Sequence, residues 1–296
     1  MKIALLLPAL LLMATLQAQV AVEDDLGHTV TLASPAQRVV SLAPHATELL
    51  YAVGAGNQLV GAVEHSDWPP EARELSRVGG YSRLDLEAIL ALEPDLVVAW
   101  DSGNPQGQLQ RLRDLGLTVY TSEPRALADI PQALVRLGTL TGHKEQGRAA
   151  AADFRTKLAQ LAQRYAQRPE LRVFYQVWNQ PLVTLGQDHL ISHIIQLCGG
   201  RNIFDDLTVM APHIDLEAVL LRNPEVIVAS GMGEERPEWL EDWQRWPTLS
   251  AVAAGNLFFI HPDIIQRHSP RVLEGAARLC EHLDTARRRL RKAKAP

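Results

Sequence analysis

The sequence predicts an α/β protein of two related lobes that are joined by a single long α-helix, with a ligand cleft between the lobes. Three observations support this: a repeated segment, apolar strand-like runs that each follow a short helix, and a long helical stretch between the two copies. Of the 296 residues, 47% are hydrophobic and 21% are charged, as in an ordinary globular protein. The formal charge of −5 gives no reason to expect a nucleic-acid partner.

The repeat defines one structural unit in each lobe. Residues 85–99 recur without a gap at 215–229, with eight of the fifteen positions identical. In each copy an aspartate, Asp85 or Asp215, is expected to cap a short helix, and a proline ends that helix. The β-branched run that follows is typical of a strand buried on both faces. A helix that leads into such a strand is half of a Rossmann-like unit, so each copy indicates one α/β lobe.

The remaining elements fall on either side of a central helix. Further strands are expected at residues 38–42 and 116–120 in the first lobe and at 172–177 and 255–260 in the second. Between the lobes, residues 142–168 have helical periodicity, and 148–168 contain neither proline nor glycine. We therefore assign the N-terminal lobe to residues 19–141, the interlobe helix to 142–168 and the C-terminal lobe to 169–286.

The end of the second lobe contains two further patterns. The indoles of Trp239, Trp243 and Trp246 share a helical face and are expected to pack in the core. Residues 287–296 are rich in arginine and lysine, and we expect a solvated basic tail there.

The first 18 residues have the pattern of a secretory signal peptide. One positive charge precedes an apolar run that is too short to span a bilayer, and small residues follow it. We expect cleavage after Ala18, although a buried N-terminal helix is the alternative. No cysteine follows the run, so a lipid anchor is not expected, and the mature protein should be soluble outside the cytoplasm. In that compartment Cys198 and Cys280 are expected to form a disulfide, with two buried free thiols as the alternative.

Motifs for catalysis and cofactor binding are missing from the sequence. It contains no GxGxxG, Walker A, HExxH or GxSxG motif, and its ten histidines are scattered along the chain. No catalytic residue, resident cofactor or metal site is therefore predicted. A cleft between two lobes without these motifs favours a binding protein. An exported hydrolase is the alternative from another class, because a catalytic triad can be assembled from distant residues.

Several segments resemble one protein family. The chain is similar to the periplasmic solute-binding proteins of ABC importers whose lobes are joined by one long helix, and which carry siderophores, haem or cobalamin. The segments that carry the resemblance are residues 25–32, 35–48, 66–70, 86–87, 94–100, 197–204 and 267–271. The resemblance is greatest to the members that carry cobalamin. It implies a periplasmic carrier, monomeric when free, that captures a corrinoid with a small hinge motion and delivers it to an inner-membrane permease dimer with its ATPases.

The resemblance also implies a role for two repeated glutamates. Glu87 and Glu217 occupy equivalent positions near helix N-termini, one in each lobe. Family members dock through one such glutamate per lobe onto arginines of the two permease subunits, an arrangement that suits a twofold-symmetric cationic partner. The repeat alone leaves open that both are ordinary first-turn glutamates, which the helix dipole favours.

Matching the family position by position implies a ligand site in the cleft. The matched residues are His65, Tyr81 and Trp100 in lobe one and Asp263, Ile264, Ile265, Gln266 and Arg267 in lobe two. Trp100 also stands out from the repeat, because it ends a strand and its counterpart is Ser230, so the fold does not require an indole there. A corrinoid is broad and partly apolar with amide arms, so aromatic faces and a few polar groups suit it.

The chain departs from the cobalamin-carrying members at three places, which makes the cleft less aromatic. Tyr81 and residues 210–213 stand where those members often have tryptophan, and Ile264–Ile265 replace an aromatic pair. Haem is therefore the alternative ligand, with Tyr81 or His65 as an axial ligand. A ferric siderophore would need several arginines in the cleft, for which Arg83 and Arg267 are the candidates.

Overall fold

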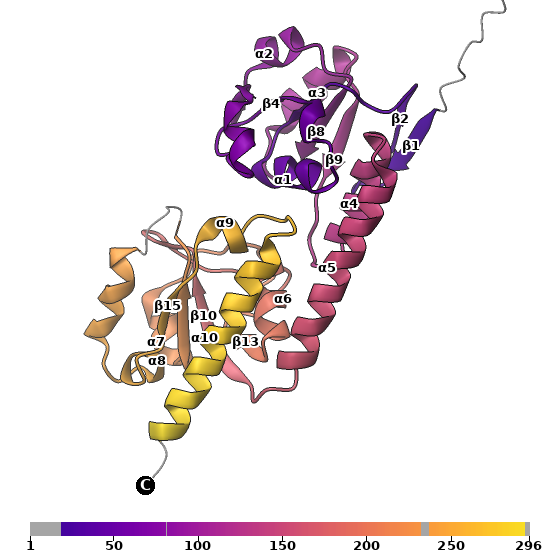
Figure 1. Ribbon diagram of the computed structural model, residues 1–296. Coiled ribbons are helices and arrows are strands. Elements are labelled where there is room, and N and C mark those ends of the chain that lie inside the picture. Colours follow the sequence, from indigo (N-terminus) through magenta and orange to yellow (C-terminus); the bar gives the residue numbers. More distant parts are fainter. Residues whose placement is uncertain (1–18, 81, 232–236, 294–296) are drawn as a thin grey trace, which may run out of the picture.

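A computed structural model describes residues 19–80, 82–231 and 237–293, which form two α/β lobes joined by one long helix (Figure 1). The expected signal peptide and Tyr81 lie outside the described residues. Among the helices that are described, none is both long enough and apolar enough to cross a membrane.

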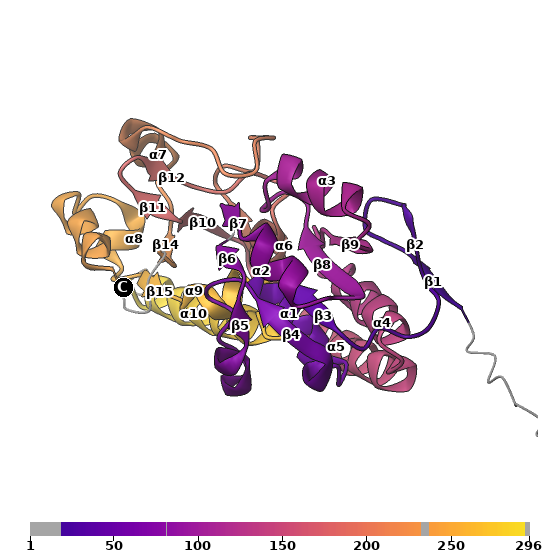
Figure 2. The same cartoon turned by 90° about the horizontal axis from the view of Figure 1, so that it is seen from above.

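Lobe one is built on a five-stranded parallel sheet. Its strand order is β5 (Ser76–Arg77), β4 (Leu59–Ala62), β3 (Val39–Ser41), β8 (Leu96–Trp100) and β9 (Val119–Ser122). The helices are α1 (Pro44–Ala52), α2 (Leu86–Ala91), α3 (Gln106–Asp114) and α4 (Ile130–Leu140), with 3₁₀ turns at Gly56–Gln58 and Pro70–Glu74. The hairpin of β1 (Val20–Glu23) and β2 (Thr29–Leu32) lies beside α4 at the outer edge (Figures 1 and 2). A second, short hairpin pairs β6 (Gly79–Gly80) with β7 (Arg83–Leu84).

Lobe two repeats this plan on a smaller scale. Its parallel sheet has the order β13 (Gly200–Asn202), β10 (Leu171–Gln176), β14 (Val226–Ala229) and β15 (Leu257–Phe259). The helices are α6 (Leu190–Leu197), α7 (Leu216–Arg222), α8 (Ser250–Ala253), α9 (Pro262–Ile265) and α10 (Val272–Ala293). A short hairpin pairs β11 (Trp178–Asn179) with β12 (Leu182–Val183). Of the predicted tryptophan face, Trp239 and Trp243 lie on a 3₁₀ helix, Glu238–Arg245, and Trp246 follows it. All three pack in the hydrophobic cluster of this lobe, as expected.

The sequence repeat corresponds to the same unit in both lobes. In lobe one α2 leads into β8, which lies between β3 and β9, and in lobe two α7 leads into β14, which lies between β10 and β15. Asp85 caps α2 by accepting a hydrogen bond from the backbone N–H of Ala88 at 3.0 Å. The matching cap expected at Asp215 is wrong, because that carboxylate accepts no such bond. The backbone differs, with ψ of 92° at Asp85 and 150° at Asp215, and this changes the direction of the side chain.

The predicted interlobe helix is α5, Lys144–Tyr165, whose 22 residues span about 33 Å. It packs against α4 in lobe one and against α6 and α10 in lobe two (Figure 1). Two glycines allow close approach to α4, since a Cβ on Gly138 would lie 2.9 Å from the Cα of Gly147. The largest hydrophobic cluster runs through α5 from one lobe to the other. The helix is therefore part of both cores and is not a flexible linker.

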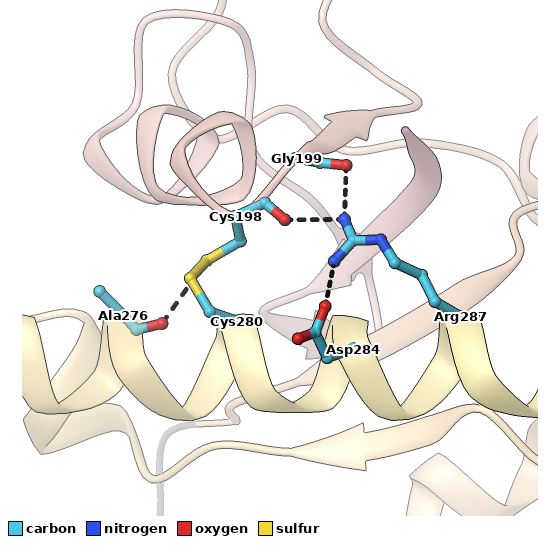
Figure 3. The surroundings of a disulfide bond; sticks show 6 residues. All are labelled: Cys198, Gly199, Ala276, Cys280, Asp284 and Arg287. Carbon is cyan, nitrogen blue, oxygen red and sulfur yellow. Dashed lines mark hydrogen bonds and ion pairs between the residues drawn. A yellow bond between two sulfur atoms is a disulfide. The ribbon is translucent and has the colours of Figure 1, made fainter. Parts of the chain in front are cut away.

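The predicted disulfide joins Cys198, at the end of α6, to Cys280 on α10, and both residues are fully buried (Figure 3). Beside it Arg287 donates hydrogen bonds to the backbone oxygens of Cys198 and Gly199 at 2.8 Å and pairs with Asp284. Arg287 is 5% exposed and α10 continues to Ala293, so the expected basic tail begins as a packed helix. The last backbone carbonyls of a helix lack partners within the helix and need a hydrogen-bond donor. The cationic Arg287 is such a donor at α6, and its charge also suits the negative end of the helix dipole.

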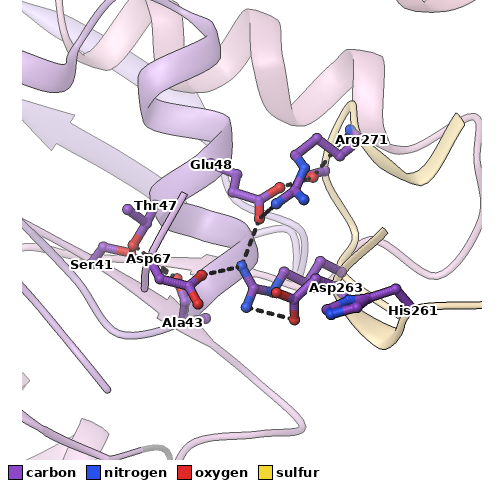
Figure 4. Close-up of polar contacts among 10 residues, drawn as sticks. Ser41, Ala43, Thr47, Glu48, Asp67, His261, Asp263 and Arg271 are labelled. Atoms are coloured by element: carbon purple, nitrogen blue, oxygen red, sulfur yellow. Dashed lines mark hydrogen bonds and ion pairs between the residues drawn. The ribbon is translucent and has the colours of Figure 1, made fainter. Parts of the chain in front are cut away.

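A cluster of charged groups connects the two lobes directly. We call it the interlobe joint and define it as Glu48 and Asp67 of lobe one with Asp263, Arg267, Ser269 and Arg271 of lobe two. The Glu48 side chain on α1 is 2% exposed and accepts from Arg267 at 2.9 Å and Arg271 at 3.0 Å (Figure 4). Ser269 donates a hydrogen bond to the same carboxylate.

Further contacts fix both arginines of the interlobe joint. Arg267 also pairs with Asp67 and Asp263, each at 2.7 Å, and Arg271 stacks over the indole of Trp68 at 4.2 Å. Burial raises the pKa of the Glu48 carboxyl, although Ser269 and the two arginines oppose this shift. Burial would also raise the pKa of Asp67, but its hydrogen bond and ion pair with Arg267 lower that pKa overall. The interlobe joint is thus a buried network in which each partner compensates the desolvation of another.

The disulfide should contribute substantially to stability. Replacing both cysteines, Cys198→Ala with Cys280→Ala, frees a loop that spans a sequence separation of 82 residues. We expect the free energy of unfolding to fall by about 2–5 kcal/mol, measured by urea denaturation. Wild-type protein denatured and refolded with a reducing agent should match the double variant. An unchanged urea midpoint would show that the disulfide does not stabilise the fold.

Glu48→Gln should destabilise the protein far more than loss of a surface ion pair. It removes the charge that compensates two buried arginines, for which a cost of about 3–5 kcal/mol is typical. The matched control is Asp153→Asn, which breaks an exposed pair with Lys157 and should cost about 1 kcal/mol or less. Urea denaturation of both variants measures the difference. Equal midpoints would mean that the interlobe joint does not hold the lobes together.

Candidate functional site

A cavity of about 230 Å³ lies between the two lobes. Its lining comes from lobe one at Trp100, Ser102, Glu123, Pro124 and Arg125, and from lobe two at Val177, Leu185, Asp188, His189, Leu190, Ile191, Met210, Ala211, Gln266 and His268. Trp100 ends β8, residues 123–125 follow β9 and Val177 follows β10. The cavity therefore lies beyond the carboxyl ends of both parallel sheets, where α/β folds bind ligands.

Trp100 lies in the wall of this cavity, as its position at the end of the repeated strand predicted. Its ring is half-buried and meets His45 edge-on, with centroids 5.4 Å apart. The side chain of Asn104 accepts a hydrogen bond from the Trp100 backbone N–H at 2.7 Å and so holds the turn after the strand. Its counterpart in the repeat, Ser230, is fully buried and accepts a hydrogen bond from the Gln266 side chain at 2.5 Å. This bond holds Gln266, which is the other predicted ligand residue that lines the cavity.

The other predicted ligand residues of lobe two do not line the cavity. Ile264 is 7% exposed and Ile265 is fully buried, both within the main hydrophobic cluster, so their expected place in the cleft is wrong. The cause is the close packing of α9 on α10, where a Cβ on Gly275 would lie 2.3 Å from the Ile264 carbonyl oxygen. Asp263 and Arg267 pair with each other within the interlobe joint and not at the cavity.

The predicted residues of lobe one are only partly brought together. His65 is exposed in a turn after β4, with φ of 62°, and it does not line the cavity. Tyr81 lies outside the described residues. Glu87 and Glu217 are exposed in the first turns of α2 and α7. Arg83, a candidate siderophore contact, lines a separate groove beside Glu87.

Three histidines that sequence reasoning missed form a row across the lobes. His45 from α1 lies 5.8 Å from His268, and His268 lies 6.4 Å from His189, measured between ring centroids. Burial lowers the pKa of His45 to about 3, of His268 to about 4 and of His189 to about 3. All three imidazoles are therefore neutral near pH 7. The described residues contain no cluster of three side chains arranged to hold a metal ion.

Three charged side chains line the cavity: Glu123, Arg125 and Asp188. Glu123 pairs with Arg125 at 3.7 Å and accepts a hydrogen bond from the backbone N–H of Ser102 at 3.0 Å. Asp188 adds one further carboxylate. The rest of the lining is apolar, aromatic or neutral, so the cavity suits a large ligand with neutral polar groups better than a strongly anionic one.

Comparison with known proteins agrees with this architecture. A model of the periplasmic binding protein family matches residues 39–264. The chain is 40% identical over 254 residues to the vitamin B12-binding protein of Vibrio cholerae, covering 86% of this chain and 91% of that protein. It is 36% identical to the vitamin B12-binding protein of Vibrio parahaemolyticus, covering 86% and 92%.

Solved structures give the same result. The crystal structure of the periplasmic vitamin B12 binding protein BtuF of Vibrio cholerae matches with a TM-score of 0.79 and 40% identity, covering 86% of this chain and 98% of that one. A periplasmic haem-binding protein from Pseudomonas aeruginosa matches with a TM-score of 0.72 and 25% identity, covering 83% and 91%. The predicted family is thereby confirmed: this chain belongs to the periplasmic binding protein family.

Proposed function

We propose that the protein is a periplasmic carrier, which captures a corrinoid of the cobalamin type between its lobes and delivers it to an ABC importer. The cavity carries this proposal, because an indole and apolar walls lie beyond both sheets with few ionised groups. The 40% identity to a vitamin B12-binding protein over 86% of the chain supports it. A carrier needs no resident cofactor and no turnover, and none is proposed.

The charges of the cavity favour a corrinoid over the two alternative ligands. Corrinoid arms end in neutral amides, whereas haem carries carboxylates, which a lining with two carboxylates and one arginine would repel overall. A ferric siderophore would need free arginines, but Arg267 is already paired with three carboxylates. Haem remains the second candidate, because a haem-binding protein has a similar structure and because imidazoles reach the cavity.

Loading requires the lobes to move. A corrinoid is larger than a cavity of about 230 Å³, so the cleft must widen before the ligand enters. Since α5 belongs to both cores and the interlobe joint holds the lobes together, we propose a small hinge motion and not a wide opening.

Purified protein should retain cyanocobalamin through gel filtration, as seen in its absorption spectrum. Trp100→Leu should weaken binding by about ten-fold or more, since losing a buried aromatic contact costs about 1.4 kcal/mol or more. The matched control is Trp246→Leu, another half-buried indole, which packs on Trp243 and should leave affinity unchanged. Retention of a haem Soret band with no corrinoid retained would overturn the proposal.

We further propose that Glu87 and Glu217 dock the loaded protein onto cationic residues of the permease dimer. Both are exposed at equivalent positions of the two lobes, so two anions can meet two equivalent subunits. Reversing both charges, Glu87→Arg with Glu217→Arg, should abolish transport in reconstituted vesicles while ligand affinity stays constant. Glu145→Arg, an exposed first-turn glutamate on α5, is the control and should transport normally. Loss of ligand affinity in the double variant would contradict docking.

A further inference from the structure

His189 occupies an unusual position at the start of α6. It is the N-cap residue of that helix, and its ring is partly exposed in the wall of the cavity. The Nδ1 atom accepts a hydrogen bond from the backbone N–H of Ile191 at 3.1 Å. The backbone oxygen of His189 accepts from Ser192 at 2.8 Å, so main chain and side chain are both held by the first helical turn.

This hydrogen bond determines which nitrogen carries the proton. An atom that accepts from a backbone N–H must offer a lone pair, so Nδ1 is unprotonated. Burial, and then the nearby His268 and His193, lower the pKa of His189 to about 3, and the ring is therefore neutral at pH 7. A neutral imidazole has one N–H, which must be at Nε2.

Nε2 has no hydrogen-bond partner among the described residues, although the ring lines the cavity. A donor in the cavity wall that has no protein partner is available to a ligand acceptor, which would take the place of water there. The same proton prevents Nε2 from acting as a metal ligand, because a ligating nitrogen needs its lone pair.

We infer that His189 is a fixed hydrogen-bond donor to the bound corrinoid, in which Nε2–H binds a ligand oxygen and does not ligate the metal. This inference rests on the function proposed above. The oxygen that accepts is an amide carbonyl of a ring arm or a phosphate oxygen of the nucleotide loop. Both are acceptors, and cobinamide, which lacks the nucleotide loop, distinguishes them.

The protonation state can be measured without any ligand. Long-range ¹H–¹⁵N correlation spectra of the full-length protein at pH 7 should show His189 as the neutral Nε2–H tautomer. Adding cyanocobalamin should shift the Nε2–H resonance and slow its exchange with water. An Nδ1–H tautomer or an imidazolium in the free protein overturns the inference, whatever the ligand proves to be.

His189→Ser removes the donor while a serine oxygen can still cap α6. We expect its affinity for cyanocobalamin to fall about three- to ten-fold, the value of one neutral hydrogen bond. His261→Ser is the matched control, because His261 caps α9 in the same way, through Nδ1 and the N–H of Asp263 at 3.2 Å, but does not line the cavity.

The outcomes separate the inference from the function. An equal loss of affinity for cobinamide assigns the acceptor to a ring amide, and a loss for cyanocobalamin alone assigns it to the phosphate. If wild-type protein binds cyanocobalamin and His189→Ser binds it equally well, the inference is wrong while the proposed function stands. If wild-type protein binds no corrinoid, both are wrong, and the tautomer measured in the free protein does not change that result.

Discussion

One buried carboxylate constrains the whole molecule. It belongs to lobe one, but the cations that compensate its charge come from lobe two. Glu48 is almost fully enclosed, and its compensating arginines, Arg267 and Arg271, follow α9 of lobe two. Pulling the lobes apart at this point would break the ion pairs that Glu48 makes with both arginines and that Asp67 makes with Arg267. We therefore expect the lobes to rotate about the interlobe joint and α5, so that the cleft opens at its mouth and the lobes do not separate at the joint.

The same constraint explains the chemistry of the cavity. Arg267 and Asp263, which the family resemblance implied as ligand residues, are held in the interlobe joint, so their charges are compensated before any ligand arrives. Next to Arg267, His268 stays neutral because it is buried. The lining thus combines an indole, aliphatic groups and uncharged imidazoles with few charged groups. Such a wall recognises shape and neutral polar groups more than charge.

Features that are local in sequence could be predicted. The gap-free repeat located two equivalent strands, and the helical stretch without proline or glycine located α5. The tryptophan at position 100, where the second copy has Ser230, indicated one wall of the cleft. Each of these features depends on residues within about one helix or strand, where hydrophobic periodicity and helix capping determine the local structure.

Features built from distant residues could not be predicted. Glu48 and Arg267 are 219 positions apart, and the histidine row joins three separate segments. Ile264 and Ile265 were expected in the cleft because the family has aromatic residues there, but nothing local shows that Gly275 lets α9 pack so closely. Whether a polar residue faces a ligand or a neighbouring lobe is decided by the tertiary fold.

The chain passes from lobe one to lobe two at α5, and this order affects how the protein folds during synthesis. Each lobe is a continuous stretch of chain, so every strand of lobe one is available for folding before lobe two has been synthesised. Until then Glu48 has no cationic partner from lobe two and remains open to water. The pairing of Glu48 with Arg267 spans 219 positions, so it can form only after lobe two is present, and it then joins the two lobes.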